Sequence, residues 1–353
     1  MKKLVSVLLA ALLGTAAAEV WYVHPDSSLN SIQEALDLCY EGDTVLVAAG
    51  TWPGGYQWPA TADITVIGEA GPDGTVVDGN GIRQGFDLFD VPGSGTLIRG
   101  LAIVDCYSGG TGGGVGAIQS SLTLVDCRFA GNDARLGGGL HCEYGTLTAR
   151  HCFFDGNNSL QYSGGGISLG NSCTALIESS LVARNRNGGI SFSEGRTTVI
   201  RRCDIFGNEG EAVGYSGGGG QNATAENNWW GDASGPWHPS LNPDGQGDTV
   251  SDWVDFDPWL AAPVAVAEGP TPHASRIAPG ATILRGSLNL TPDISNLTSD
   301  IALLDAAGRR VMSLREGAND LSRLAPGVYF ICPYASAVGR EKSAKGRALL
   351  VLR

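Results

Sequence analysis

The stretch LTLVDCRFAGN (122–132) returns 25 residues later as LTARHCFFDGN (147–157), and the fold prediction rests on this repeat. Three further copies align with it, and a degenerate one follows: LIRGLAIVDC (97–106), ALIESSLVARN (175–185), TVIRRCDIFGN (198–208) and ATAENNWWGDA (223–233). Units of 20 to 50 residues that cannot bury their apolar side alone are typical of solenoids. Glycine-rich runs such as GGGLHC (137–142) separate the copies, so each coil is predicted to hold about three short strands joined by glycine-bearing turns.

Equivalent positions of successive coils stack about 4.8 Å apart, so each column of the alignment becomes a row along the solenoid. The apolar columns predict the core: Ile98, Leu124, Ala149, Ile177 and Ile200, then Ile103, Phe129, Phe154, Val182 and Ile205. An asparagine column predicts a ladder of bonded side-chain amides: Asn132, Asn157, Asn185 and Asn208. One outward column alternates in charge and predicts a solvated surface: Arg99, Val125, Arg150, Glu178, Arg201 and Glu226.

A short helix is predicted before the first coil. Ser31-Ile32-Gln33-Glu34 fits a capping box, and apolar residues at helical spacing follow up to Cys39, so we expect an amphipathic helix lying over the end of the stack. SIQEALDLCYEGDTVLVAAGTW (31–52) resembles the opening of pectate-lyase-like right-handed β-helix proteins, and NNWWGDASGPWHP (227–239) resembles the last coil of exported β-helix repeat proteins. The resemblance implies an all-β, right-handed parallel β-helix over 19–260 and no particular activity, because that superfamily includes several enzyme classes and non-enzymes.

The two ends of the chain predict export. A basic start, an apolar run over 4–13 and Ala16-Ala17-Ala18 are typical of a signal peptide over 1–18. That run is half the length of a membrane span, so the mature chain is expected to lack a transmembrane segment. Residues 261–282 are rich in Pro and Ala and predict a linker, and 283–353 predict a small β-sandwich. LLDAAGRRVMSLREGANDLSRLAPGVYFI (303–331), with the ending GRALLVLR, resembles the sorting domain of the type IX (Por) secretion system, which implies that machinery as a partner and a secreted or cell-surface location.

Charge separates the two parts of the chain. Residues 19–282 hold 11 Arg, no Lys and 30 Asp or Glu, a net of −19, whereas 283–353 hold 10 basic and 6 acidic residues, a net of +4. Such asymmetry indicates separate domains. The acidic body would repel phosphates, so no nucleic-acid partner is expected.

Four residues are catalytic candidates: His141 at an outward position beside a glycine-rich strand, and Arg135, Glu209 and Glu211 in nearby loops. His141 could act as a base and Arg135 could bind a uronate carboxylate. The stronger interpretation is a solvated polar face with one exposed histidine, since no paired-carboxylate or calcium-plus-arginine pattern recurs in adjacent coils. Asp244, Asp248 and Asp252 are Ca²⁺ candidates, although a solvated acidic turn is the favoured interpretation. No other cofactor is expected. Five tryptophans near them are expected to pack over the last coil, with stacking on sugars as the alternative: Trp229, Trp230, Trp237, Trp253 and Trp259.

Eight cysteines in an exported chain permit disulfides. Cys127 and Cys152 would lie one coil apart with parallel side chains, so small buried thiols are favoured over a bond between them. For function, a non-catalytic structural, adhesin-like or glycan-contacting role is favoured. The alternative is a polysaccharide lyase or hydrolase with a divergent site on the β-helix face.

Overall fold

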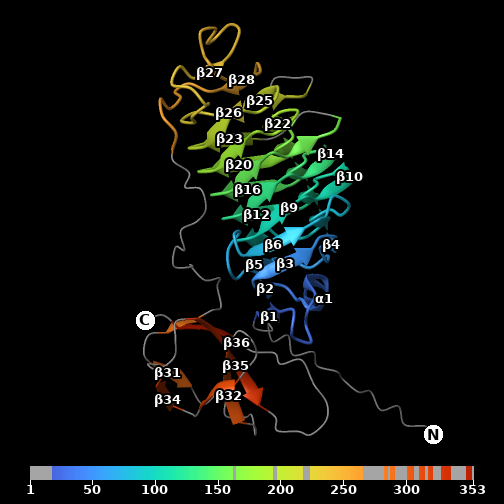
Figure 1. Ribbon diagram of the computed structural model, residues 1–353, viewed down its shortest axis with the longest axis vertical. Coiled ribbons are helices and arrows are strands. Elements are labelled where there is room, and N and C mark those ends of the chain that lie inside the picture. The colour runs from blue at the N-terminus through green and yellow to red at the C-terminus, as the bar shows by residue number, and fades with distance from the viewer. Residues whose placement is uncertain are drawn as a thin grey trace, which may run out of the picture.

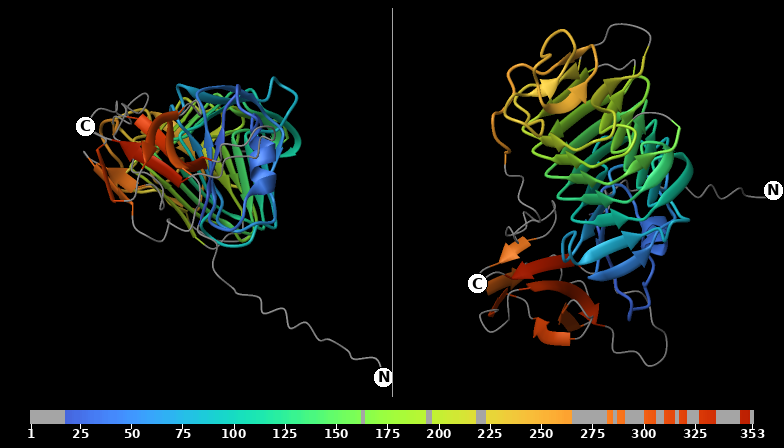
Figure 2. Two further views of the ribbon diagram at one scale, coloured as in Figure 1. Left: turned by 90° about the horizontal axis from the view of Figure 1, so that it is seen from below. Right: turned by 45° about the horizontal axis from the view of Figure 1, so that its top comes forward.

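The computed structural model describes residues 18–161, 164–193, 197–217 and 223–264, together with strands between 282 and 351. Parallel strands wind into a stack of coils, and strands from successive coils form three long sheets that run the length of the stack (Figure 1). In the view along the stack, the coils superpose (Figure 2, left). The predicted signal peptide lies outside the described residues apart from its last position. Among the described residues, no helix is long and apolar enough to cross a membrane.

Strands that begin the repeat form a parallel ten-stranded sheet. In sheet order, these strands are β1 (Val20–Val23), β2 (Thr44–Val47), β5 (Thr65–Gly68), β8 (Leu97–Arg99), β12 (Ser121–Val125), β16 (Thr146–Arg150), β20 (Thr174–Glu178), β23 (Thr197–Arg201), β26 (Ala223–Thr224) and β29 (Val254–Asp255). After a corner, the chain enters a seven-stranded sheet. Its members are β3 (Gly50–Pro53), β6 (Thr75–Asp78), β9 (Ala102–Val104), β13 (Arg128–Ala130), β17 (Phe153–Asp155), β21 (Leu181–Ala183) and β24 (Asp204–Phe206).

The glycine-rich runs lead into a nine-stranded parallel sheet. It contains β4 (Tyr56–Gln57), β7 (Phe86–Phe89), β11 (Val115–Ile118), β15 (Leu140–Glu143), β19 (Ile167–Leu169), β22 (Ile190–Phe192), β25 (Glu211–Tyr215), β28 (Gly247–Val250) and β27 (Pro236–Trp237). Three additional strands form an outer sheet that the repeat did not predict: β10 (Tyr107–Thr111), β14 (Asp133–Leu136) and β18 (Asn158–Ser159). They lie along one side of the stack, where β10 and β14 are labelled (Figure 1).

The predicted asparagine ladder is confirmed. Asn132 Nδ2 donates to Asn157 Oδ1 at 2.9 Å, Asn157 Nδ2 to Asn185 Oδ1 at 3.1 Å, and Asn185 Nδ2 to Asn208 Oδ1 at 2.9 Å. Each of these amides also donates to a backbone carbonyl of the preceding coil, so the buried polar groups are satisfied. Asp248 ends the ladder, because its carboxylate accepts from Asn208 Nδ2 at 3.0 Å and from two backbone N–H groups.

The apolar columns form the core as predicted. Phe129 and Phe154 are fully buried and stack with ring centroids 4.7 Å apart. The corner between the ten- and seven-stranded sheets repeats a left-handed backbone conformation in successive coils, and four of these residues are Asp126, His151, Ser179 and Arg202. Left-handed residues turn the chain sharply, which directs these side chains outward at the corner.

The helix α1 (Ile32–Leu38) has Ser31 as its N-cap and buries Ile32, Ala35 and Leu36. It contacts β1, β2 and β4, while β1 is the terminal strand of the ten-stranded sheet. In the tail, one sheet has the order β30 (Thr282–Leu284), β36 (Arg347–Val351), β35 (Gly327–Tyr334), β32 (Asp300–Asp305) and β33 (Arg310–Leu314). β31 (Ser287–Leu290) and β34 (Gly317–Asp320) form a separate antiparallel pair. The packing of these sheets into a sandwich, and almost all of the linker, lie outside the described residues.

Candidate functional site

His141 is buried, which corrects the expectation of an exposed histidine. It lies on β15 and points outward from the nine-stranded sheet, yet its side chain is only 2% exposed. Segments that lead into this sheet fold back against its outer face: the turn at Gly164 lies against Ser191, and the Thr111 carbonyl lies against Gly116. The polar row on this face is therefore covered by the chain itself and is not a solvated surface.

Within this covered row, His141 lies between a hydroxyl and a carboxylate. Its Nδ1 is 3.3 Å from Ser168 Oγ in the next coil, and its Nε2 is 3.7 Å from Glu143 Oε2 on its own strand. Among the described residues, no group makes a hydrogen bond with Nε2, and Glu143 accepts a hydrogen bond from Asn171 Nδ2 at 2.9 Å. A serine, a histidine and a carboxylate in line are the groups needed to activate a hydroxyl nucleophile.

Burial sets the charge of this histidine. Removal from water lowers the pKa of His141, and the nearby Glu143 carboxylate opposes that change without reversing it. At neutral pH the ring is therefore uncharged and able to accept a proton. However, Ser168 is only 5% exposed, so this row is closed to a polymer.

The other predicted catalytic residues do not join His141 in one site. Arg135 lies on β14 with its side chain exposed, and its carbonyl accepts a hydrogen bond from Ser159 Oγ. Glu209 is exposed in the turn before β25. Burial and repulsion from Asp252 raise the pKa of Glu211, whose side chain folds over Gly214. Thus Glu211 lies beside the last coils and has an acidic neighbour there.

The three metal candidates are also separate. Asp248 ends the asparagine ladder, Asp244 lies in an exposed turn, and Asp252 Oδ1 is 3.2 Å from His238 Nε2. In the part of the chain that the structure describes, no group of three His, Cys, Asp or Glu residues could hold a metal ion. Asp248 and Asp252 thus have partners of their own within the protein, which are Asn208 and His238.

The tryptophans near the last coil divide between packing and exposure. Trp230 is fully buried in the core. Trp259 packs against this core, and its Nε1 donates to the Ala233 carbonyl at 3.2 Å. Trp237 and Trp253 are 41% and 50% exposed, and Trp253 meets Tyr215 edge-on with ring centroids 6.4 Å apart. Packing thus accounts for part of this cluster only.

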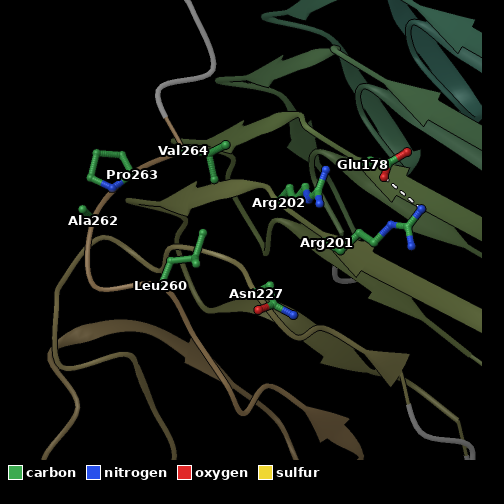
Figure 3. Close-up of a pocket in the computed structure, with 8 residues that line it drawn as sticks. All are labelled: Glu178, Arg201, Arg202, Asn227, Leu260, Ala262, Pro263 and Val264. Carbon is green, nitrogen blue, oxygen red and sulfur yellow. Dashed lines mark ion pairs between the residues drawn. The ribbon is translucent and has the colours of Figure 1, made fainter.

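An open hollow of about 700 Å³ lies away from these residues (Figure 3). It is at the corner that follows the strands of the ten-stranded sheet. We call it the corner hollow, and its lining is Glu178, Arg201, Arg202, Asn227, Leu260, Ala262, Pro263 and Val264. Its volume is within the usual range for small-molecule sites. The sequence does not predict this hollow, because Glu178 and Arg201 belong to a column of alternating charge that indicates only a solvated surface.

The segment 258–264, which follows the last coil, forms one wall of the corner hollow. The Pro258 carbonyl accepts from Asn227 N at 2.6 Å, Leu260 N donates to the Asn228 carbonyl at 2.9 Å, and Val264 N donates to Asp204 Oδ1 at 2.7 Å. These bonds hold the apolar side chains of Leu260 and Val264 opposite the arginines (Figure 3). The hollow thus has one apolar wall and one polar wall.

Charge on the polar wall is only partly neutralised. Glu178 bridges two arginines, with Oε1 at 2.9 Å from Arg201 and Oε2 at 3.2 Å from Arg150. Although burial raises the pKa of Glu178, these guanidinium groups outweigh it and hold that pKa below its usual value. No ion pair involves Arg202 among the described residues, and its side chain is exposed beside Asn227. Arg202 can therefore donate hydrogen bonds to a ligand oxygen.

The match to one protein-family model agrees with the architecture. A protein-family model described as "Right handed beta helix region" matches residues 91–236, so this stretch is a right-handed β-helix. No curated protein matches the chain. The solved pectin methylesterase from Aspergillus niger is similar at 15% identity and a TM-score of 0.40, covering 72% of this chain and 90% of its own. Pectate lyase Pel9A is similar at 16% identity and a TM-score of 0.42, covering 87% of this chain and 89% of its own.

Proposed function

We propose that this protein is an exported, non-catalytic β-helix that contacts a glycan through the corner hollow. The proposal rests on the two unlike walls of this hollow. Arg202 and Asn227 present hydrogen-bond donors on one wall. Leu260 and Val264 present apolar side chains on the other. Sugars offer hydroxyl or carboxylate oxygens at their edges and C–H groups on their faces. Such a ligand matches a site with a few placed polar groups and apolar walls.

The net charge of the body limits the ligand. With a net of −19 over 19–282, a long polyanion would be repelled along the coils. A short oligosaccharide or a chain end that places one carboxylate near Arg202 avoids that repulsion. We therefore expect the ligand to carry few negative charges.

The non-catalytic part of the proposal is supported by the candidates themselves. His141 and Ser168 are covered, whereas Arg135 and Glu209 are exposed on other segments. Neutral and uronate-containing oligosaccharides titrated into the full chain by calorimetry would test binding. Arg202→Ala should weaken the affinity about 10- to 100-fold, because a charge-assisted hydrogen bond contributes about 1.5–3 kcal/mol. Arg128 on β13 is also exposed. Arg128→Ala should therefore bind like the parent, and equal losses in both variants would reject the proposal.

A second candidate, a hydrolase acting on a polysaccharide ester, is favoured by the line of Ser168, His141 and Glu143. It requires the covering segments to open. Incubation of the full chain with esterified polysaccharides, followed by titration of released acid, would test it. Turnover that Ser168→Ala abolishes would replace the non-catalytic proposal, while turnover unchanged in that variant would exclude this site.

Export is supported by the signal-like start and by the basic tail that resembles a type IX sorting domain. Deletion of 283–353 should trap the protein in the periplasm of a host with that machinery. Delivery to the surface without the tail would contradict the assignment.

A further inference from the structure

Two buried thiols from consecutive coils meet near the corner that follows the nine-stranded sheet. Cys142 lies on β15, and Cys173 lies directly before β20. Their sulfur atoms are 3.2 Å apart, and the two residues are 0% and 1% exposed. A disulfide has a sulfur separation of about 2.0 Å, so roughly 1.2 Å remains to be closed.

The two cysteines approach from different positions of the coil. The register pairs Cys142 with Leu169, not with Cys173, which follows four residues later after the chain has turned. Their side chains therefore converge, as a disulfide requires. By contrast, Cys127 and Cys152 hold equivalent positions, and each thiol donates to the carbonyl two residues earlier in its own coil.

We propose that Cys142 and Cys173 form a disulfide that ties two consecutive coils together. In this reaction a Cys142 or Cys173 thiolate attacks the disulfide of an oxidant, releases one oxidant thiolate and forms a mixed disulfide. The second cysteine, as its thiolate, attacks the protein sulfur of that mixed disulfide and releases the second oxidant thiolate. Two protons leave the protein thiols, two electrons pass to the oxidant, and the oxidant disulfide becomes two thiols.

Burial determines when the exchange takes place. The hydrogen bond to Cys142 and burial raise the pKa of the Cys173 thiol, so the reactive thiolate is scarce once the coils are closed. The bond is therefore made while the chain folds and is protected from reductants afterwards. This inference does not rest on the proposed glycan site.

The full chain, refolded in a buffer of reduced and oxidised glutathione, tests the bond. After denaturation and alkylation without reduction, six of the eight cysteines should be modified. Digestion with trypsin and chymotrypsin should yield a linked peptide pair containing Cys142 and Cys173, because cleavage sites separate Cys173 from Cys152. Eight modified cysteines, or a linkage of other cysteines, would overturn the proposal.

Two variants complete the test. Cys142→Ser should make Cys173 available to the alkylating agent, whereas Cys127→Ser should leave the Cys142–Cys173 peptide intact. If Cys142→Ser fails to fold, the peptide analysis of the parent chain still decides, because it needs no variant.

Discussion

Asn157 is the position where the stack is expected to be most sensitive to a small change. Its side chain is fully buried and makes four hydrogen bonds, to Asn132 N, Asn132 Nδ2, Asn185 Oδ1 and the Phe129 carbonyl. Asn157→Ala removes all four and leaves Asn132 N without its acceptor. A buried unsatisfied group costs about 1–3 kcal/mol, and we expect a total loss of about 2–4 kcal/mol in the free energy of unfolding.

Chemical denaturation followed by circular dichroism measures this loss as a fall in the midpoint. Asn171→Ala is the matched control, since Asn171 is exposed and makes its 2.9 Å bond to Glu143 at the surface. Exposed substitutions usually change stability by less than about 0.5 kcal/mol. If Asn157→Ala destabilises the protein no more than Asn171→Ala does, the ladder is not a source of stability and the reasoning is refuted.

Further predictions concern the core and pH. Phe154→Ala should lower the free energy of unfolding by about 3–5 kcal/mol, because it leaves a cavity beside the stacked ring of Phe129. Phe89→Ala should lower it little, since Phe89 is 62% exposed. Equal denaturation midpoints for the two variants would contradict this. Since the pKa of His141 is lowered in the folded state, the unfolded chain binds its proton more readily as the pH falls below about 6.5, and stability should decrease there until the folded pKa is passed. The midpoint of chemical denaturation, measured between pH 7.5 and 5, should therefore fall less in His141→Gln than in the parent. An equal fall in both proteins would show that His141 does not cause the effect.

The disulfide also predicts a stability difference. Its closed loop spans residues 142–173, and the chain-entropy estimate for such a loop is about 3–4 kcal/mol. Protein refolded with oxidised glutathione should unfold at a higher denaturant concentration than protein kept reduced. Equal midpoints would show that the link adds no stability.

The sequence predicted what depends on the repeat. A column of Asn132, Asn157 and Asn185 at equivalent positions has one simple explanation, which is stacking of identical groups, and the hydrogen bonds confirm it. Residues of the outward column whose charges alternate likewise form ion pairs, such as Glu178 with Arg150 and Arg201.

What the repeat could not predict is how segments outside it cover the coils. The alternation of inward and outward side chains along β15 correctly predicts that His141 points out of the coil. The segments that cover this side chain come from the turns before the strands. A period-2 pattern does not predict the path of such turns. The corner hollow was equally hidden, because Val264 bonds to Asp204, 60 residues earlier in the chain. Two adjacent arginines at a corner, Arg201 and Arg202, are a feature of the sequence that could have indicated this hollow.

Hydrogen–deuterium exchange of the full chain, with and without a bound oligosaccharide, tests the glycan site most directly. We expect slower exchange for the amides of Arg201, Arg202, Asn227 and 259–262 in the presence of the sugar, and no change along β15 and β19. Protection confined to the face that carries His141, or no protection anywhere at saturating sugar, would contradict this expectation.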